Sequence, residues 1–144
     1  MSAQPGAAAA KKILAVDDDF HTRTLLVDLC ESAGFEVFQA TDGEEALAWV
    51  PRWESGETKP AVILLDLKLP KIDGLAVLKT LKAHAVLRRI PVVVLTTSGE
   101  DCDIQAAYDL GANSYIIKPV GFDNFMNVAQ QIELYWCVLN ELNG

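Results

Sequence analysis

Short apolar segments alternate with amphipathic segments along most of this chain. The apolar segments have the length and composition of strands that are buried on both faces of a sheet. The segments between them carry apolar residues three and four positions apart, which predicts helices that cover such a sheet. We expect strands at residues 13–16, 35–39, 61–65, 91–95 and 114–117. We expect helices at residues 22–33, 42–50, 74–83, 101–110 and 123–139.

Glycine and proline mark several of the expected boundaries. Gly34 and Gly111 directly follow two of the expected helices, where a glycine commonly ends a helix. Pro51 is expected to end or bend the helix at 42–50, because proline lacks the backbone N–H that a helix interior requires. The polar residues 54–59 should then form a loop.

Regular alternation of strands and helices predicts an α/β fold, with a parallel sheet covered by helices on both faces and right-handed crossovers. The 144 residues suffice for one domain with one core. We expect the alanine-rich residues 1–10 to be a disordered tail, and residues 11–144 to be a single domain that ends in the long helix at 123–139.

The charge of the chain limits its partners. A net charge of −8 argues against direct binding of nucleic acid or of an anionic membrane surface, which both attract basic proteins. No apolar segment approaches the roughly 18 residues of a membrane-spanning helix. Three scattered cysteines without metal-binding spacing indicate thiols in a reducing cytoplasm, so we expect a cytoplasmic protein without a disulfide framework.

Polar side chains follow four of the expected strands. Asp17 and Asp18 follow the first strand, Asp66 the third, Thr96 the fourth and Lys118 the fifth. A lone carboxylate within a buried sheet is costly, so these acids should lie at the carboxyl ends of the strands, where α/β proteins bind ligands. All of these side chains should therefore meet at one edge of the sheet.

Several carboxylates in one pocket repel one another unless a cation lies between them. Hard oxygen ligands with open water positions suit Mg²⁺, which prefers a few carboxylates together with phosphate oxygens. We expect Mg²⁺ to be held by Asp17, Asp18 and Asp66, with the backbone carbonyl of Lys68 as a further ligand. Asp17 is expected to act mainly through bound water.

The same residues suit the transfer of a phosphoryl group onto a carboxylate. Asp66 would be the nucleophile and would become an aspartyl phosphate. Lys118 would pair with one phosphoryl oxygen, and the Thr96 hydroxyl would donate to another. Thr97 is the competing hydroxyl, but Thr96 follows the apolar run directly.

These motifs, in this order, resemble those of the receiver domains of two-component response regulators. The resemblance covers about residues 11–139, and no single motif would be specific alone. The matching segments are ILAVDDD at 13–19, ILLDL at 63–67, LP at 69–70 with DG at 73–74, VLT at 94–96 and YIIKP at 115–119.

The resemblance implies a flavodoxin-like (βα)5 fold with strand order 2-1-3-4-5. It implies that Asp66 accepts a phosphoryl group from a sensor histidine kinase, and that Asp17 and Asp18 are the acidic pair of the family. Thr96 and Tyr115 fall on the switch positions of the family, whereas Asp19 is expected to begin the following helix. Such a protein is a phosphoacceptor in signalling rather than an enzyme that acts on other molecules.

A narrower resemblance is to single-domain regulators that are partnered with phytochrome-type histidine kinases in bacteria. It is carried by residues 92–98 and 107–111 and by Tyr135-Trp136. It implies a light-linked donor kinase and a homodimer, formed through the last helix or through the face that this helix shares with the helix at 101–110 and the strand at 114–117. The end of the last helix, which includes Tyr135 and Trp136, has more apolar residues than one buried helix face requires. We therefore expect it to form an interface.

Three other functions share part of this pattern. A magnesium-dependent phosphatase of the haloacid-dehalogenase type also uses a strand-end aspartate, but it requires a second acid where Lys68 stands. A flavin-binding electron carrier would need a hydroxyl-rich phosphate loop where Asp17 and Asp18 stand. A receiver-like adaptor that never carries phosphate would not need the complete set of acids, hydroxyl and lysine.

Overall fold

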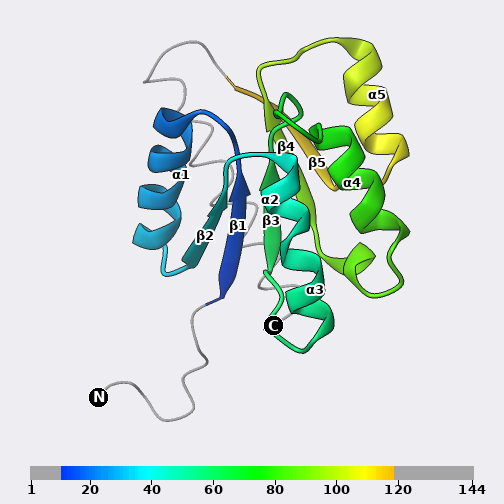
Figure 1. Cartoon of the computed structure of the whole chain (residues 1–144). Coiled ribbons are helices and arrows are strands. Elements are labelled where there is room, and N and C mark those ends of the chain that lie inside the picture. The colour runs from blue at the N-terminus through cyan, green and yellow to red at the C-terminus, as the bar shows by residue number, and fades with distance from the viewer. Residues whose placement is uncertain (1–10, 119–144) are drawn as a thin grey trace.

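Five parallel strands form a single sheet in the computed structural model, which describes residues 11–118 (Figure 1). Their order is β2-β1-β3-β4-β5, so the predicted strand order and fold class are confirmed. The strands are β1 (Lys12–Val16), β2 (Glu36–Ala40), β3 (Val62–Leu65), β4 (Val92–Thr96) and β5 (Ser114–Ile117). The helices are α1 (Phe20–Ser32), α2 (Gly43–Leu47), α3 (Trp49–Glu54), α4 (Gly74–Ala83), α5 (Asp101–Asp109) and the short 3-10 helix η1 (Leu87–Arg89).

Some predictions fall outside the described residues. These are the tail at 1–10, the helix at 123–139 and the interface residues Tyr135 and Trp136. Between 11 and 118, no helix has both the length and the apolar character needed to cross a membrane.

The prediction for the segment after β2 was right about where helical structure begins and wrong about where it ends. One helix at 42–50 was expected to end or bend near Pro51, but the chain forms α2, a single turn residue and then α3, which continues to Glu54. Pro51 lies in the first turn of α3, where backbone N–H groups have no partner within the helix. The missing N–H of Pro51 therefore removes no hydrogen bond from the helix. Of the predicted loop at 54–59, only residues 57–59 lie outside α3 and the turn that ends it.

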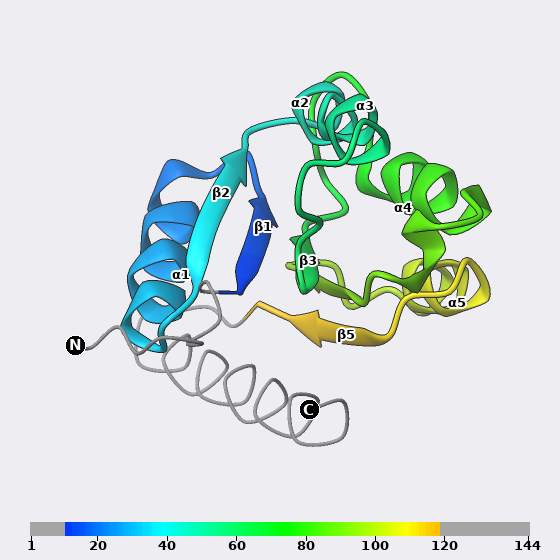
Figure 2. The same ribbon diagram turned by 90° about the horizontal axis from the view of Figure 1, so that it is seen from below.

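Alternate residues of each inner strand face opposite sides of the sheet. Ile13 and Val62 belong to the cluster that packs under α1, whereas Leu14 and Ile63 belong to the cluster under α2 to α5. Figure 2 shows α1 on one side of the sheet and the other described helices on the opposite side. Apolar side chains on both faces explain why the strands read as continuous apolar runs.

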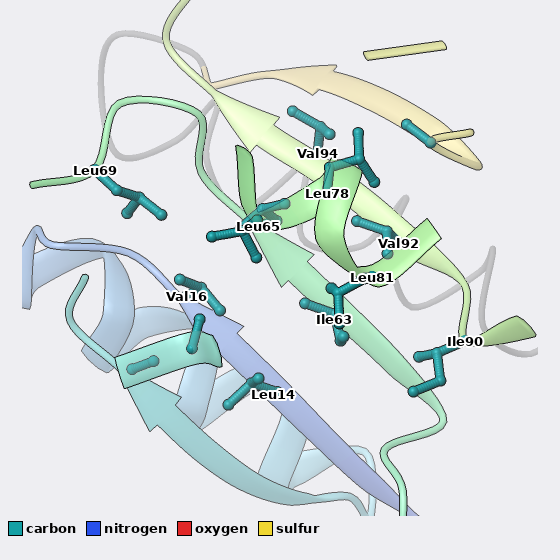
Figure 3. Packing of buried hydrophobic residues seen from close by; sticks show 14 of the residues in the cluster. Leu14, Val16, Ile63, Leu65, Leu69, Leu78, Leu81, Ile90, Val92 and Val94 are labelled. Carbon is teal, nitrogen blue, oxygen red and sulfur yellow. The ribbon is translucent and has the colours of Figure 1, made fainter. Parts of the chain in front are cut away.

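Helix α4 is fixed to the centre of the sheet by its apolar face. Figure 3 shows Leu78 and Leu81 lying over Ile63, Leu65 and Val92 of the two central strands. Leu78 is fully buried, and Leu81 is 2 % exposed. This packing sets the position of the loop between β3 and α4, which carries the residues that follow Asp66.

Aspartates begin three of the helices. The carboxylates of Asp19, Asp42 and Asp73 accept hydrogen bonds from the backbone N–H three residues later, which fixes the starts of α1, α2 and α4. The expectation that Asp19 begins a helix is confirmed, although α1 starts at Phe20 rather than at residue 22. The hydrogen bond from Glu45 N is the main cause that lowers the pKa of Asp42.

The start of α4 packs directly against the backbone of Asp66 and Leu67. The N–H of Gly74 donates to the Leu67 carbonyl at 2.9 Å. A Cβ atom at Gly74 would lie 2.1 Å from the Asp66 carbonyl oxygen and 2.6 Å from Leu67 Cα. Only glycine therefore allows this approach, and the DG motif at 73–74 serves both to cap α4 and to bring it against the strand end.

We expect Gly74→Ala to destabilise the protein by about 3 kcal/mol, because the new methyl group meets backbone atoms that cannot turn away. Urea unfolding measures the difference. Gly99→Ala is the matched control, since its Cβ would meet only the Ile117 side chain, at 3.3 Å, and it should cost about 1 kcal/mol or less. Equal losses for the two variants would contradict the close approach at Gly74.

Candidate functional site

The two acidic segments lie side by side because β1 and β3 are neighbours in the sheet. The backbone N–H of Asp66 donates to the Val16 carbonyl at 3.0 Å, and that of Asp17 donates to the Ala40 carbonyl at 3.1 Å. Each aspartate thus continues the hydrogen bonding of its strand by one residue. The side chains of Asp17 and Asp66 are 2 % and 7 % exposed.

Lys118 joins these two carboxylates. Its backbone N–H donates to the Thr96 carbonyl, which fixes the residue at the end of β5 beside β4. Its ammonium group lies 2.6 Å from Asp17 Oδ2 and 2.9 Å from Asp66 Oδ2. With its own side chain 9 % exposed, Lys118 is a buried cation between two buried anions.

Burial and pairing act in opposite directions on the titration of these groups. Burial raises the pKa of Asp17, although the hydrogen bond and charge of Lys118 oppose this change. Burial also disfavours the charge of Lys118, but its contacts with Asp17 and Asp66 outweigh burial and raise the pKa of Lys118. The pocket therefore holds a carboxylate that resists ionisation and a lysine that keeps its proton.

Asp18 completes a group of three acids. One carboxylate oxygen from each of Asp17, Asp18 and Asp66 lies within 4.8 Å of the others. Asp18 is exposed, unlike the other two, so the group is open to solvent on one side. Oxygen ligands gathered in this way fit a small divalent cation that keeps several water molecules.

Lys68 lies at the rim of this site, on the loop that follows β3. Its backbone N–H donates to Asp66 Oδ1 at 3.2 Å, which holds the carboxylate by its second oxygen. Its side chain lines an open groove of about 440 Å³ together with Asp18, Asp73 and Asp103. The groove borders the acidic group at Asp18.

Thr96 and Tyr115 lie on the neighbouring strands β4 and β5. Thr96 is fully buried at the end of β4, and its hydroxyl oxygen accepts from the N–H of Ser98 at 3.5 Å. The hydroxyl of Tyr115 donates to the Ser98 carbonyl at 2.8 Å, so β5 is tied to the loop that follows Thr96. Burial is the main cause that raises the pKa of Tyr115.

Arg23, which was not among the predicted site residues, supports the site from α1. Its guanidinium donates to the backbone carbonyl of Asp17 at 2.8 Å and to the side chain of Gln39 at 3.0 Å. Arg23 lies on the buried side of α1 together with Leu26 and Cys30, and the helical spacing of these three residues could have indicated this. A charged residue on the buried stripe of a helix needs a polar partner, which here is the turn that carries the acidic pair.

The structure therefore brings together four of the five side chains expected at the strand ends, and it places the fifth, Thr96, at the end of β4 beside β3. Two buried carboxylates share one ammonium group, an exposed carboxylate stands beside them, and a buried hydroxyl lies on the adjacent strand. Chemically, such a site can hold a divalent cation and stabilise the oxygens of a phosphoryl group next to a nucleophilic carboxylate. The expected interface residues Tyr135 and Trp136 lie beyond the described residues.

Comparison with known proteins identifies the family of the chain. Residues 13–130 match the family described as "Response regulator receiver domain". The chain is 40% identical over 135 residues to a probable methanogenesis regulatory protein, FilR2, of Methanothrix harundinacea, with 92% of this chain and 87% of FilR2 covered. It is 37% identical over 130 residues to response regulator Rcp1 of Synechocystis sp., with 88% of each chain covered.

Solved structures give the same result. The chain superposes on the Mn²⁺-bound form of Rcp1 with a TM-score of 0.82 at 36% identity, covering 88% of this chain and 94% of that one. The phosphorylated cyanobacterial phytochrome response regulator RcpA gives 0.83 at 38% identity, with 90% and 95% covered. The bacteriophytochrome response regulator RtBRR gives 0.69 at 43% identity, with 87% and 78% covered. The chain belongs to the family of response regulator receiver domains, and its similarity extends to phytochrome-associated regulators of the stand-alone type.

Proposed function

We propose that this protein, as a single receiver domain over residues 11–144, accepts a phosphoryl group on Asp66 from a sensor histidine kinase. The observation that supports this most is the bridge from Lys118 to both Asp17 and Asp66 beside the exposed Asp18. This arrangement places a cation against the Asp66 carboxylate, and that cation can pair with an oxygen of the phosphoryl group. A haloacid-dehalogenase-type phosphatase is disfavoured by Lys68 and by the family match.

In the reaction, a carboxylate oxygen of Asp66 forms a bond to phosphorus while the bond between phosphorus and the donor's imidazole nitrogen breaks. The electron pair of the broken bond stays on the imidazole, which takes up a proton from solvent. The Lys118 ammonium then pairs with one phosphoryl oxygen, and the Thr96 hydroxyl donates to another. Both groups stabilise negative charge where it gathers during transfer.

The acidic group fits Mg²⁺, with Asp17, Asp18, Asp66 and the Lys68 carbonyl as the residues that would hold it or its water molecules. Mg²⁺ would supply neutralisation of the charge that spreads over the transferring group. Asp17 would act mainly through water, since its Oδ2 accepts from Lys118 and its Oδ1 from the N–H of Asp19. The Mn²⁺ named for the structure of Rcp1 supports a divalent cation here.

The signal would leave the site through Thr96 and Tyr115. A phosphoryl group adds about 1.5 to 2 negative charges, and the Thr96 hydroxyl would move toward it. The Tyr115 ring and the face formed by α5, β5 and the expected helix at 123–139 would follow, which shifts the population of two states. This face, or the last helix with Tyr135 and Trp136, would bind a partner or a second copy of the chain.

A phytochrome-type kinase is the donor that we propose, because phytochrome response regulators are among the relatives with solved structures. The test mixes the purified protein and Mg²⁺ with candidate histidine kinases that have first been phosphorylated on their histidine. Intact mass should show one added phosphoryl group, and transfer from a phytochrome-type kinase should be faster than from unrelated kinases. Failure with every kinase and with acetyl phosphate would overturn the proposal.

Magnesium binding makes a separate prediction at Asp18. At a hundredfold excess over its dissociation constant, Mg²⁺ should raise the free energy of unfolding by about 2.7 kcal/mol. Asp18→Asn should leave the stability of the metal-free protein within about 0.5 kcal/mol, because Asp18 is exposed, but it should remove most of the gain from Mg²⁺. Asp109→Asn, on the exposed end of α5, is the control that should keep the full gain. Urea unfolding with and without Mg²⁺ measures both, and an undiminished gain in Asp18→Asn would exclude Asp18 as a ligand.

A further inference from the structure

Asp103 is a partly buried acid of α5 that the proposed reaction does not use. Its Oδ2 atom accepts a hydrogen bond of 2.6 Å from the hydroxyl of Ser98. The same oxygen lies 3.8 Å from the ammonium nitrogen of Lys68. One carboxylate oxygen thus receives a hydroxyl from the loop after β4 and a cation from the loop after β3.

Both donors belong to loops that border the phosphoacceptor. Lys68 is two residues after Asp66 and donates its backbone N–H to the Asp66 carboxylate. Ser98 is two residues after Thr96, is 8 % exposed, and gives its carbonyl to the Tyr115 hydroxyl. Lys68 and Asp103 also line the same groove as Asp18, whose carboxylate lies in the group that contains Asp66.

We infer that Asp103 competes with the phosphoryl group of Asp66 for the side chain of Lys68. Before phosphorylation, the Asp103 carboxylate pairs with Lys68 at 3.8 Å. A phosphoryl group brings more negative charge and more acceptor oxygens to the neighbouring residue. The Lys68 side chain, 67% exposed and flexible, turns to it and leaves Asp103 with Ser98 alone.

This competition couples the phosphorylation of Asp66 to α5, which is part of the face proposed to bind a partner. Asp103 lies in the first turn of α5, so loss of its cation weakens the tie between the start of that helix and the loop that carries Lys68. Ser98 connects the same carboxylate to Tyr115 through its own backbone carbonyl. Asp103 therefore opposes phosphorylation of Asp66. When Asp66 is phosphorylated, the loss of the contact between Asp103 and Lys68 changes how the start of α5 is held.

The inference rests on the proposed function, and a phosphoryl mimic tests it. Asp103→Asn keeps an oxygen that can accept from Ser98 but removes the charge that holds Lys68. Its affinity for beryllofluoride in the presence of Mg²⁺, measured by calorimetry, should rise about two- to five-fold, the range of an exposed ion pair. In a Lys68→Met background, the same substitution should leave the affinity unchanged.

The matched control is Asp101→Asn, which removes an equal charge from an exposed position in the same first turn. An equal rise in this control, or a rise for Asp103→Asn that persists without Lys68, would show a general charge effect and overturn the inference. So would an unchanged or lower affinity for Asp103→Asn. If the unsubstituted protein forms no beryllofluoride adduct at all, the proposed function itself fails, which is a different result.

Discussion

Asp66→Asn is expected to abolish phosphorylation by acetyl phosphate and by any donor kinase. The amide that replaces the carboxylate has nearly the same shape, but its oxygen is a poor nucleophile and carries no charge. The position is held from both sides, by Lys118 at 2.9 Å and by the Lys68 N–H at 3.2 Å, so the variant should keep the local structure. Intact mass after reaction with Mg²⁺ present should show no phosphoryl group.

The control for this variant is Asp109→Asn, the same chemical change at the exposed end of α5. It should be labelled as fully as the unsubstituted protein. Labelling that persists in Asp66→Asn would contradict the assignment, and peptide mapping would then identify the true acceptor. Asp17 is the alternative to inspect first, because it is the other buried carboxylate paired with Lys118.

The sheet could be predicted from the sequence because its central strands are buried on both faces. Residues 62–65 and 92–95 read as unbroken apolar runs, and every residue of β3 and β4 is buried. The candidate site followed from the same pattern. A polar residue directly after such a run must lie at the strand end, and the carboxyl ends of parallel strands share one edge of the sheet.

Local geometry limited the prediction around Pro51. The apolar periodicity of the segment does not distinguish one bent helix from two short ones, since both bury Trp53 and Ala46 on the same side. The outcome depends on where the second helix begins relative to Pro51. A proline ends a helix from its interior but is harmless in a first turn.

Contacts between distant segments limited the prediction of the site. The pairing of Lys68 with Asp103 joins the loop after β3 to the first turn of α5, and these segments share no pattern in the sequence. Arg23 could have been found, because a charged residue on a buried stripe requires a partner, but the identity of that partner, the Asp17 carbonyl, depends on how α1 packs. Sequence thus indicates the chemistry at the strand ends better than the side chains that support it.

Lys118→Met should have the largest effect on stability, a loss of about 3 to 5 kcal/mol for the metal-free protein at neutral pH. The variant keeps much of the apolar volume but leaves the buried carboxylates of Asp17 and Asp66 without their cation. Removing one partner of a buried ion pair lowers the free energy of unfolding by more than the intact pair contributes to it, because the remaining charges stay out of water. Urea unfolding measures the loss, and Asp17→Asn in the same background should recover a large part of it.

The pH dependence of this loss has a definite sign. The pKa of Asp17 is raised above 3.8 by burial, so the folded state holds that proton more tightly than the unfolded chain. Stability from this group is present at low pH and is lost as pH rises through the folded pKa. Without Lys118 this effect becomes stronger, and the deficit of Lys118→Met should shrink as the pH is lowered toward that pKa. In the unsubstituted protein, the raised pKa of Lys118 means that its own contribution is lost only above about pH 10.5. A deficit that does not change with pH would mean that Lys118 acts by packing rather than by its charge.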